Sequence, residues 1–460
     1  MRYISTRGTA PEVDFEGALL TGLAPDGGLY VPAAWPDLPD ISPDSTYAEV
    51  AAAVVFPFVE GVFSADEIRD MAREVYGNFR HDDVAPLRPL ESGEMLLELF
   101  WGPTLSFKDY ALQLVGRLLD EVLRRRGERV TVVGATSGDT GSAAIDALRD
   151  LESIDVVMLH PEGRVSDVQR RQMTTVLSPN IHNFAVRGTF DDCQDLVKAM
   201  FSDEGLRAEV RPAAVNSINW ARIMSQTAYY VWSAHRIGAT DGVAFAIPTG
   251  NFGNVYSAYA AKQMGLQISQ LIVGNNANHG LADFLDSGSL PIGEVVPTLA
   301  PAMDIQVPSN LERLLFDVFE RRGEVLAALM KDYRQAGSLD VLPLQLAAVR
   351  ALFSSGYAGD EVILATIRDV YHETGVVVDP HTAAGIAAGR AQRADPDTPL
   401  VFVATAHPAK FPEAVKSVLH LEPDLPDDLG DLMDREEKYE TVENDFEAVA
   451  RAVRRVAAGP

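Results

Sequence analysis

Short apolar runs and longer amphipathic segments alternate along the chain from about residue 96 to about residue 420. The pattern is clearest in three units: RVTVVGATSGDTGSAAIDALRD at residues 129–150, GVAFAIPTGNFGNVYSAYAAKQM at residues 242–264 and PLVFVATAHPAKFPEAVKSVL at residues 399–419. In each unit a β-branched run enters a turn of small residues, and a segment with helical periodicity follows. Buried strands that alternate with helices predict an α/β fold with a mostly parallel sheet.

The segments on either side of this region differ from it. Residues 1–95 are rich in Pro and Asp, contain a turn-dense stretch at residues 25–40, and predict a helix at residues 46–59. We expect a small N-terminal domain there. Residues 421–460 are acidic and then helical, over ENDFEAVARAVRRVAA at residues 443–458. We expect this tail to pack on the rest of the chain or to contact a partner.

Composition and charge exclude several classes of function. The 460 residues are 47% hydrophobic and 23% charged, which is ordinary for a globular protein with a sizeable core. A formal net charge of −27 argues against binding to nucleic acid or to an anionic membrane surface, since both need basic surface. A site for an anionic ligand must therefore be a local positive pocket.

The sequence also predicts a compartment. No apolar run reaches the roughly 18 residues that a membrane-spanning helix needs, and the first residues show no signal or transit peptide. The single cysteine, Cys193, excludes an internal disulfide and a cysteine metal cage. We expect a cytoplasmic protein without a bound metal.

Two of the small-residue turns are candidate anion sites. A turn from strand to helix directs backbone N–H groups and the positive end of the helix dipole towards one point. GNFGN, at residues 250–254, suits a phosphate, because its glycines permit close approach and its asparagines can donate hydrogen bonds. GATSGDTG, at residues 134–141, offers hydroxyl groups for a carboxylate, although Asp139 does not suit a phosphate. Either turn could instead be an ordinary helix cap.

The segment GPTLSFKDYALQL, at residues 102–114, places Lys108 among apolar residues at the start of a predicted helix. Alone, such a lysine is typical of a surface position with an apolar stem. A lysine becomes a nucleophile when burial or neighbouring cations lower its pKa. Together with two anion cradles, this amine completes the parts for a phosphate-bearing cofactor held as a Schiff base.

Five motifs carry a resemblance to a known family. They are PTLSFKDYALQLV, VVGATSGDTGSAA, VNSINWARIMSQTAYYV, IPTGNFGNV and TAHPAKFPEAV. Together they resemble threonine synthase, a pyridoxal 5'-phosphate (PLP) enzyme of fold type II, and MRYISTRG and APDGGLYVP resemble the N-terminal domain of that family. The resemblance covers roughly residues 1–430. It implies that residues 96–420 form a PLP-binding catalytic region of two α/β subdomains, with parallel sheets flanked by helices.

The resemblance also implies roles for individual residues. Lys108 would hold PLP covalently through its ε-amine, Thr405 would hydrogen-bond the pyridine nitrogen, and Asp139 would face the phenolic oxygen of the cofactor. The residues implied to hold the cofactor phosphate are Gly250, Asn251, Phe252, Gly253 and Asn254. The residues implied to hold the substrate carboxylate are Thr136, Ser137, Gly138 and Thr140.

The implied substrate is O-phospho-L-homoserine, which water converts to L-threonine and phosphate. The substrate phosphate carries nearly two negative charges, so a local basic pair is required in so acidic a chain. We predict that Arg222 and Lys410 form that pair, with Ser217 and Asn219 as hydrogen-bond donors. Arg222 could instead make a structural salt bridge, and Lys410 could be a surface lysine at a helix start.

The sequence leaves the roles of several histidine and polar residues open. His160, Arg164, Ser166 and Gln169 match the family pattern, and a structural role is open for them. His381 could donate a proton in the reaction. The sequence favours a histidine that is satisfied by its own neighbours, because Asp379 and Thr382 can cap the helix that follows.

Two other functions remain open from the sequence. A related phospholyase would release a 2-oxoacid and ammonia, and it would need the same lysine and the same turns. A non-catalytic amino-acid-binding relative would lack the lysine or one of the turns, and this chain has all of them. For its assembly we expect a monomer or a small homo-oligomer.

Overall fold

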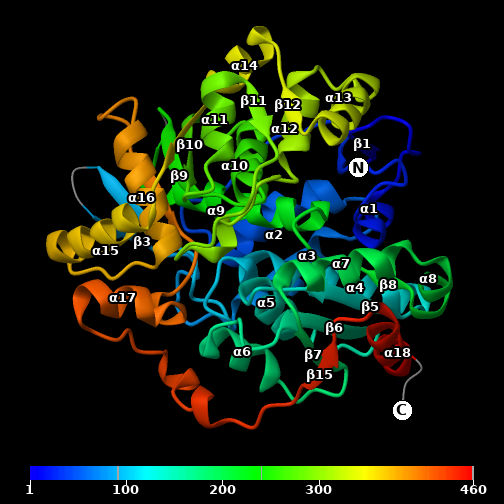
Figure 1. The fold of residues 1–460 in the computed structure, drawn as a ribbon. Helices are drawn as coiled ribbons and strands as arrows, with labels where there is room; N and C mark the ends of the chain where they lie inside the picture. Colours follow the sequence, from blue (N-terminus) through cyan, green and yellow to red (C-terminus); the bar gives the residue numbers. More distant parts are fainter. Residues whose placement is uncertain (91–92, 240, 458–460) are drawn as a thin grey trace.

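The computed structural model describes residues 1–90, 93–239 and 241–457. Two sheets dominate it (Figure 1). The large sheet has six strands in the order β13-β10-β9-β14-β4-β3, and the small sheet has five in the order β15-β7-β6-β5-β8. All neighbouring pairs in both sheets are parallel except β3 with β4. This confirms the predicted α/β class with parallel sheets and flanking helices.

The strands of the large sheet are β3 (Leu87–Pro89), β4 (Glu94–Glu98), β9 (Val243–Pro248), β10 (Ile268–Asn275), β13 (Phe353–Tyr357) and β14 (Leu400–Ala404). Those of the small sheet are β5 (Val130–Ala135), β6 (Ile154–Pro161), β7 (Ile181–Arg187), β8 (Pro212–Ala213) and β15 (Glu440–Glu443). Two antiparallel pairs complete the set: β1 (Tyr3–Ser5) with β2 (Tyr30–Pro32), and β11 (Ser289–Pro291) with β12 (Ser338–Asp340).

The helices before β9 are α1 (Phe15–Thr21), α2 (Tyr47–Val59), α3 (Ala65–Tyr76), α4 (Lys108–Arg126), α5 (Asp139–Leu148), α6 (Asp167–Thr174), α7 (Phe190–Ser202), α8 (Glu204–Val210) and α9 (Trp220–Ile237). Those after it are α10 (Gly253–Met264), α11 (Gly280–Ser287), α12 (Leu311–Val318), α13 (Gly323–Ala336), α14 (Pro343–Arg350), α15 (Asp360–Thr374), α16 (Pro380–Gln392), α17 (Pro412–Leu419) and α18 (Phe446–Ala457). The short 3-10 helices are η1 (Pro301–Met303), η2 (Pro408–Lys410), η3 (Asp427–Leu429) and η4 (Leu432–Asp434).

The three units predicted from the sequence pattern are present. Residues 129–150 form β5 and α5, residues 242–264 form β9 and α10, and residues 399–419 form β14, η2 and α17. In the large sheet β14 lies between β9 and β4, so two of the three turns leave neighbouring strands. Because ligands bind at the carboxyl ends of parallel strands, this arrangement places the turns where a site is expected.

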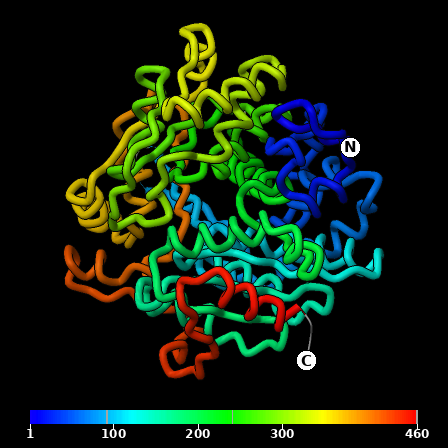
Figure 2. The backbone as a smooth tube through the Cα atoms, turned by 45° about the vertical axis from the view of Figure 1, so that its right-hand side comes forward, coloured from blue at the N-terminus to red at the C-terminus, as the bar shows by residue number. Residues whose placement is uncertain are grey.

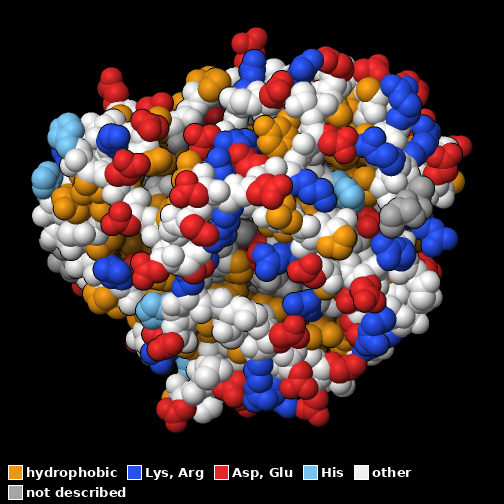
Figure 3. Space-filling model, turned by 90° about the horizontal axis from the view of Figure 1, so that it is seen from below, with side chains coloured by type: hydrophobic (Ala, Val, Ile, Leu, Met, Phe, Trp, Pro, Cys, Tyr) orange, Lys and Arg blue, Asp and Glu red, His pale blue; other side chains and the backbone are white. Residues whose placement is uncertain are grey.

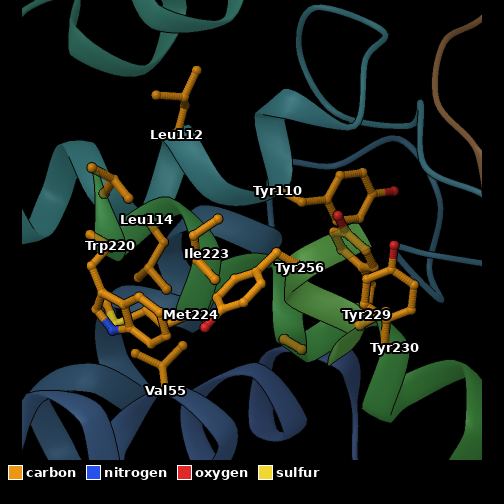
Figure 4. Close-up of a cluster of buried hydrophobic side chains, with 14 of the residues drawn as sticks. Val55, Tyr110, Leu112, Leu114, Trp220, Ile223, Met224, Tyr229, Tyr230 and Tyr256 are labelled. Atoms are coloured by element: carbon orange, nitrogen blue, oxygen red, sulfur yellow. The ribbon is translucent and has the colours of Figure 1, made fainter. Parts of the chain in front are cut away.

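Helix α4 begins at Lys108, as the sequence predicts, and its apolar side chains fix it in the core. It ends at Gly127, whose left-handed backbone (φ 64°) closes the last turn, and basic residues in that turn complement the helix dipole. Figure 4 shows Tyr110 and Leu114 of α4 beside side chains of α9 such as Ile223 and Tyr229. Burial of these residues holds the start of α4 rigidly beside α9.

The N-terminal segment contains the predicted helix at residues 46–59 as α2, which starts with a capping box between Thr46 and Glu49. Helix α2 packs on α3 and α9. Beyond these elements, β3 and β4 lie on either side of residue 92 and pair with each other in the large sheet. The boundary at residue 95 stays a prediction.

The C-terminal segment crosses from one sheet to the other. After α17 it runs along the lower edge of the molecule to β15, which pairs with β7, and to α18, which packs on α7 and α8 (Figures 1 and 2). Helix α18 matches the helix predicted at residues 443–458, as far as residue 457. Residues 458–460 of the predicted tail lie outside the described residues. The boundary at residue 421 also stays a prediction.

Within the described ranges, the search for a helix that combines the length and the apolar character needed to cross a membrane finds none.

Candidate active site

The site is built around one buried carboxylate that contacts two buried lysines. Asp139, at the start of α5, has its Oδ2 3.3 Å from Nζ of Lys108 and its Oδ1 2.8 Å from Nζ of Lys410. Lys108 begins α4 and is 8% exposed, and Lys410 ends η2 and is fully buried. The fold therefore brings together three residues that lie far apart in the sequence, in α4, α5 and η2.

The segment before Lys108 is fixed by hydrogen bonds on both sides. Asp109 accepts bonds from the backbone N–H of Thr104 (2.8 Å) and from its hydroxyl (2.6 Å). The N–H of Phe107 donates to the carbonyl of Thr405 (2.9 Å), at the end of β14. Leu105 adopts a left-handed backbone (φ 62°), a conformation that costs on the order of 1 kcal/mol for a side chain other than glycine. These contacts position the Lys108 amine beside Asp139.

Burial and charge shift the titration of the central groups. Burial lowers the pKa of the Lys108 amine, the charge of Asp139 opposes this, and the charges of Lys410 and Arg222 lower it further. Burial alone would raise the pKa of Asp139, but the charges of Lys410 and Lys108 bring it well below its usual value. The site thus keeps Asp139 ionised and favours loss of the proton from Lys108.

The turn between β5 and α5 is organised by Thr136. Its hydroxyl oxygen accepts bonds from the N–H groups of Gly138 (2.9 Å) and Gly141 (2.8 Å), so this side chain builds the turn. Gly138 has φ 139°, a region that favours glycine. Ser137 and Thr140 are half-buried in the same turn. Of the four residues predicted for the substrate carboxylate, these two have side chains that are not buried.

Two glutamines of α6 contact the site. Gln169 donates from Nε2 to Oδ1 of Asp139 (2.8 Å), and Gln172 donates to the carbonyl of Thr104 (3.2 Å). A Cβ on Gly138 would lie 2.5 Å from Cδ of Gln169, so the glycine makes room for this contact. From the sequence, Gln169 matches the family pattern with a structural role open, and Gln172 was not singled out. Gln169 and Gln172 are three residues apart, which places both side chains on one face of a helix, and this spacing was the signal in the sequence.

The GNFGN turn joins β9 to α10 with a closely packed backbone. Phe252, just before the first residue of α10, has a left-handed backbone (φ 63°). A Cβ on Gly250 would lie 2.4 Å from the carbonyl oxygen of Ala302. The carbonyl of Asn251 accepts hydrogen bonds from the backbone N–H (3.1 Å) and the side chain (3.0 Å) of Asn310. This leaves the turn little freedom to move.

Asn254 offers the clearest test of whether a phosphate fits at this turn. Its Oδ1 accepts hydrogen bonds from the hydroxyls of Tyr229 and Tyr230, which orients the side chain. Its Nδ2 is buried and has no hydrogen-bond partner among the described residues. A buried donor without an acceptor is costly, and here it lies in the first turn of α10, where the helix dipole favours an anion. The turn therefore fits the phosphate of PLP.

Arg222 is a buried cation in the first turn of α9. It is 3% exposed, and its Nε has no hydrogen-bond partner within the described part of the chain. Burial lowers the pKa of its guanidinium to about 10, although the nearby Tyr229 opposes the shift. At neutral pH it keeps its charge without a salt bridge in the described residues, so the structural salt bridge considered from the sequence is not seen.

The remaining predicted residues differ in what they can still bind. Thr405 is buried at the end of β14, and its backbone N–H donates to the hydroxyl of Thr382 (3.3 Å). Ser217 is half-buried and lies against Gly253 in the GNFGN turn. Asn219 caps α9 by accepting from the N–H of Ala221 (3.0 Å), and it donates to the carbonyl of Leu19 (2.8 Å). The Asn219 side chain therefore has a structural role, because both of its polar atoms are bonded to the backbone.

The histidines are placed as follows. His381 is satisfied on both ring nitrogens: Nδ1 lies 2.8 Å from Oδ1 of Asp379, and Nε2 accepts from the N–H of Ala302 (3.2 Å). This is the alternative that the sequence favoured. His160 is buried at the end of β6, and neither of its ring nitrogens has a partner in the described residues. Burial lowers its pKa, which keeps the ring neutral.

The positive charge of the site is local. On the face drawn in Figure 3, acidic and basic side chains are interspersed. Within the site, by contrast, the buried cations Lys108, Lys410 and Arg222 outnumber the single carboxylate Asp139 that contacts the lysines. Buried charges interact more strongly than exposed ones because water screens them less. The site therefore carries the local positive charge that an anion needs in a chain with a net charge of −27.

Three protein-family models match the chain. "Threonine synthase N terminus" matches residues 2–76, "Pyridoxal-phosphate dependent enzyme" matches residues 95–329, and "Threonine synthase, C-terminal" matches residues 382–453. The second of these spans β5, α5, α9 and the GNFGN turn, which carry much of the site.

Full-length relatives agree with these matches. A threonine synthase of Pseudomonas aeruginosa is 49% identical over 98% of this chain and 97% of its own length. The crystal structure of a PLP-bound threonine synthase of Brucella melitensis is 46% identical, with a TM-score of 0.96 over 99% of both chains. That of threonine synthase from yeast is 36% identical, with a TM-score of 0.93 over 100% of this chain and 99% of its own. The chain belongs to the threonine synthase family of PLP-dependent enzymes.

Proposed function

We propose that the site converts O-phospho-L-homoserine and water to L-threonine and inorganic phosphate. The observation that carries this proposal is that two buried groups can bind an anion, and that one of them, Arg222, lies near the Lys108 amine. Asn254, at the start of α10, has a buried donor for the cofactor phosphate that has no partner among the described residues. Arg222, at the start of α9, has a buried guanidinium that makes no salt bridge in the described chain. A substrate that carries its own phosphate uses the second position.

Lys108 is the residue that moves protons. When bound, PLP withdraws electrons from Cα of the amino acid that it holds, which makes the protons on Cα and Cβ removable. The Lys108 amine, with its pKa lowered by burial, is available as a base for the proton on Cα and then for one on Cβ. Phosphate leaves from Cγ, water adds at Cβ, and protons return to Cγ and Cα. The atoms balance as one substrate and one water to one threonine and one phosphate.

The other predicted residues would bind and orient the substrate. Ser137 and Thr140, half-buried in the turn before and within α5, would hydrogen-bond its carboxylate. Arg222 and Ser217 would bind its phosphate. Thr405 would hydrogen-bond the pyridine nitrogen of the cofactor, and the GNFGN turn would bind the cofactor phosphate. Because Lys410 is fully buried and already bonded to Asp139 and Thr104, Arg222 is the better candidate for the substrate phosphate.

The proposal is tested with the purified chain, PLP and O-phospho-L-homoserine. We expect threonine and inorganic phosphate in equal amounts, measured by amino-acid analysis and a phosphate assay. Lys108→Ala should lower turnover by at least about a thousandfold, because it removes both the covalent link to PLP and the base. Lys416→Ala, at an exposed position of α17, is the matched control and should leave turnover unchanged.

Two results would contradict the proposal. If the main products were 2-oxobutyrate and ammonia, the site would be that of the phospholyase considered from the sequence. If Lys108→Ala kept the wild-type rate, another group would be the base. The cytoplasmic location and the monomeric or small homo-oligomeric state are further expectations, which cell fractionation and light scattering would test.

A further inference from the structure

Lys410 makes two short contacts that hold its amine in place. Its Nζ lies 2.8 Å from Oδ1 of Asp139 and donates to the carbonyl of Thr104 (2.7 Å). Its side chain is fully buried. Lys108 makes the longer contact with the same carboxylate, at 3.3 Å. One carboxylate thus serves two ammonium groups, and Lys410 has the shorter bond.

The charges around Lys108 do not balance. Asp139 is the one carboxylate in ion-pair contact with Lys108 or Lys410 in the described residues, and Arg222 adds positive charge nearby. Asp109, the next residue on α4, has both carboxylate oxygens bonded to Thr104.

On the side of α16, His381 is engaged by Asp379 and by the backbone of Ala302. His407, at the start of η2, has its pKa lowered by burial to about 4 and is neutral at pH 7. Lys108 and Lys410 therefore share the single carboxylate that is in ion-pair contact with them among the described residues, and the electrostatic energy falls if one of the two lysines loses its proton.

We propose that Lys410 is a positioning residue which keeps the Lys108 amine unprotonated by taking up the charge of Asp139. This deepens the proposed function and rests on it, since that function requires Lys108 as a base. Lys108 is the lysine that gives up its proton, because Lys410 has the shorter contact with Asp139 and a second acceptor in Thr104. The lowered pKa of Lys108, caused by burial and then by the charge of Lys410 against that of Asp139, is consistent with this.

The experiment measures the protonation of Lys108 in the full chain without PLP. The chain has seven lysines, so trace labelling with acetic anhydride and peptide mapping resolves each amine separately. Only the neutral amine reacts, so the rate against pH gives the pKa of Lys108. The rate of PLP association against pH is the second readout, because the same neutral amine attacks the aldehyde.

The variants separate charge from hydrogen bonding. Lys410→Gln keeps a donor for Asp139 and Thr104 but removes the charge. The pH midpoint of Lys108 acetylation, called the Lys108 midpoint below, should therefore rise by roughly one pH unit or more. At a fixed pH below the midpoint, this is about a tenfold slower reaction. Lys410→Arg keeps the charge and should restore a midpoint near that of wild type. Lys416→Gln is the matched control and should not shift it.

Asp139→Asn supplies a test that does not depend on the folding of the Lys410 variants. It removes the attraction for the Lys108 proton, so the Lys108 midpoint should fall. Circular dichroism establishes that each variant is folded. An unchanged Lys108 midpoint in folded Lys410→Gln, or a midpoint that does not fall in Asp139→Asn, would overturn the proposal.

The proposed function can fail separately from this inference. If wild type makes no threonine from O-phospho-L-homoserine but the Lys108 midpoint responds to Lys410 as described, the function is wrong and the inference on Lys410 holds. If Lys410→Gln raises the KM for that substrate while the Lys108 midpoint stays at the wild-type value, Lys410 binds the substrate phosphate and this inference is overturned.

Discussion

At the scale of single residues, the neighbour of Lys108 has a titration of its own. Asp109 is fully buried, and burial raises the pKa of its carboxyl to about 6, against the hydrogen bonds from Thr104. The folded chain therefore holds this proton more tightly than the unfolded chain, whose aspartates have pKa values near ~3.9. The free energy of unfolding should therefore fall as the pH rises from about 4 to about 6, and this group should cause no further change above pH ~6.

Asp109→Asn tests this assignment. The amide can accept from the Thr104 N–H and donate to the Thr104 hydroxyl, so both contacts survive. Between pH ~4 and ~6 the free energy of unfolding of wild type should fall by at most about 3 kcal/mol because of Asp109, and we expect the variant to lack this decrease. Urea unfolding at several pH values measures it. Asp66→Asn, at an exposed position of α3, is the control and should keep the wild-type slope in that range. Equal slopes for Asp109→Asn and wild type would contradict the assignment.

Sequence reasoning found the residues of the site better than their partners. It predicted that Lys108 begins a helix and that His381 is satisfied by its neighbours, because both depend on local spacing. It did not foresee the contact between Lys410 and Asp139, because that pair depends on how β14 is placed relative to β5. A single sequence contains no direct signal for such a long-range ion pair.

At the scale of elements, the start of α10 determines where a phosphate can bind. Asn254→Asp keeps an acceptor for Tyr229 and Tyr230, so the fold should survive. It replaces the free donor by a negative charge in the first turn of the helix. We expect the Kd for PLP to rise by at least about a hundredfold, because two like charges a few ångströms apart repel by several kcal/mol at low dielectric. Absorbance titration with PLP measures it.

Asn78→Asp is the matched control, since Asn78 is exposed beyond the end of α3. It should leave the Kd for PLP unchanged. If Asn254→Asp bound PLP as tightly as Asn78→Asp, the phosphate would lie elsewhere.

The strand–turn–helix units could be predicted from their pattern, but α6 could not. Its sequence, DVQRRQMT, is short and polar, and no apolar periodicity marks it. It folds because Ser166 caps its first turn and because it is bonded on two sides. One side holds Gln169 and Gln172 against the site, and Arg170 on the other meets Glu437 of the C-terminal segment. Tertiary contacts of this kind are invisible to local propensity.

At the scale of the whole molecule, the C-terminal segment contacts both the segment before Lys108 and the small sheet. Asp428 forms a salt bridge with Arg80, which also donates to the carbonyls of Gly102 and Pro103 before Lys108. Farther along, α18 buries Val449 and Val453 on the small sheet. The predicted tail is therefore packed on the rest of the chain over its described residues, and contact with a partner stays a prediction.

Val453→Asp tests the contribution of α18 to the core. A charge at this fully buried position should lower the free energy of unfolding by at least about 3 kcal/mol, because nothing there compensates it. Arg451→Asp changes an exposed position of the same helix and should change stability by no more than about 0.5 kcal/mol. Thermal and urea unfolding measure both. Similar losses in the two variants would mean that α18 does not depend on this packing.

The strand order of the sheets has a consequence for folding during synthesis on the ribosome. In the large sheet, β4 pairs with β14, so residues 94–98 wait for residues 400–404. In the small sheet, β7 waits for β15 at residues 440–443. The large sheet cannot be completed until β14 has been synthesised, whereas the small sheet lacks only its edge strand β15 once β8 has been synthesised. One edge of β4 and one edge of β7 stay unpaired during that time, and such unpaired strand edges favour aggregation of a growing chain.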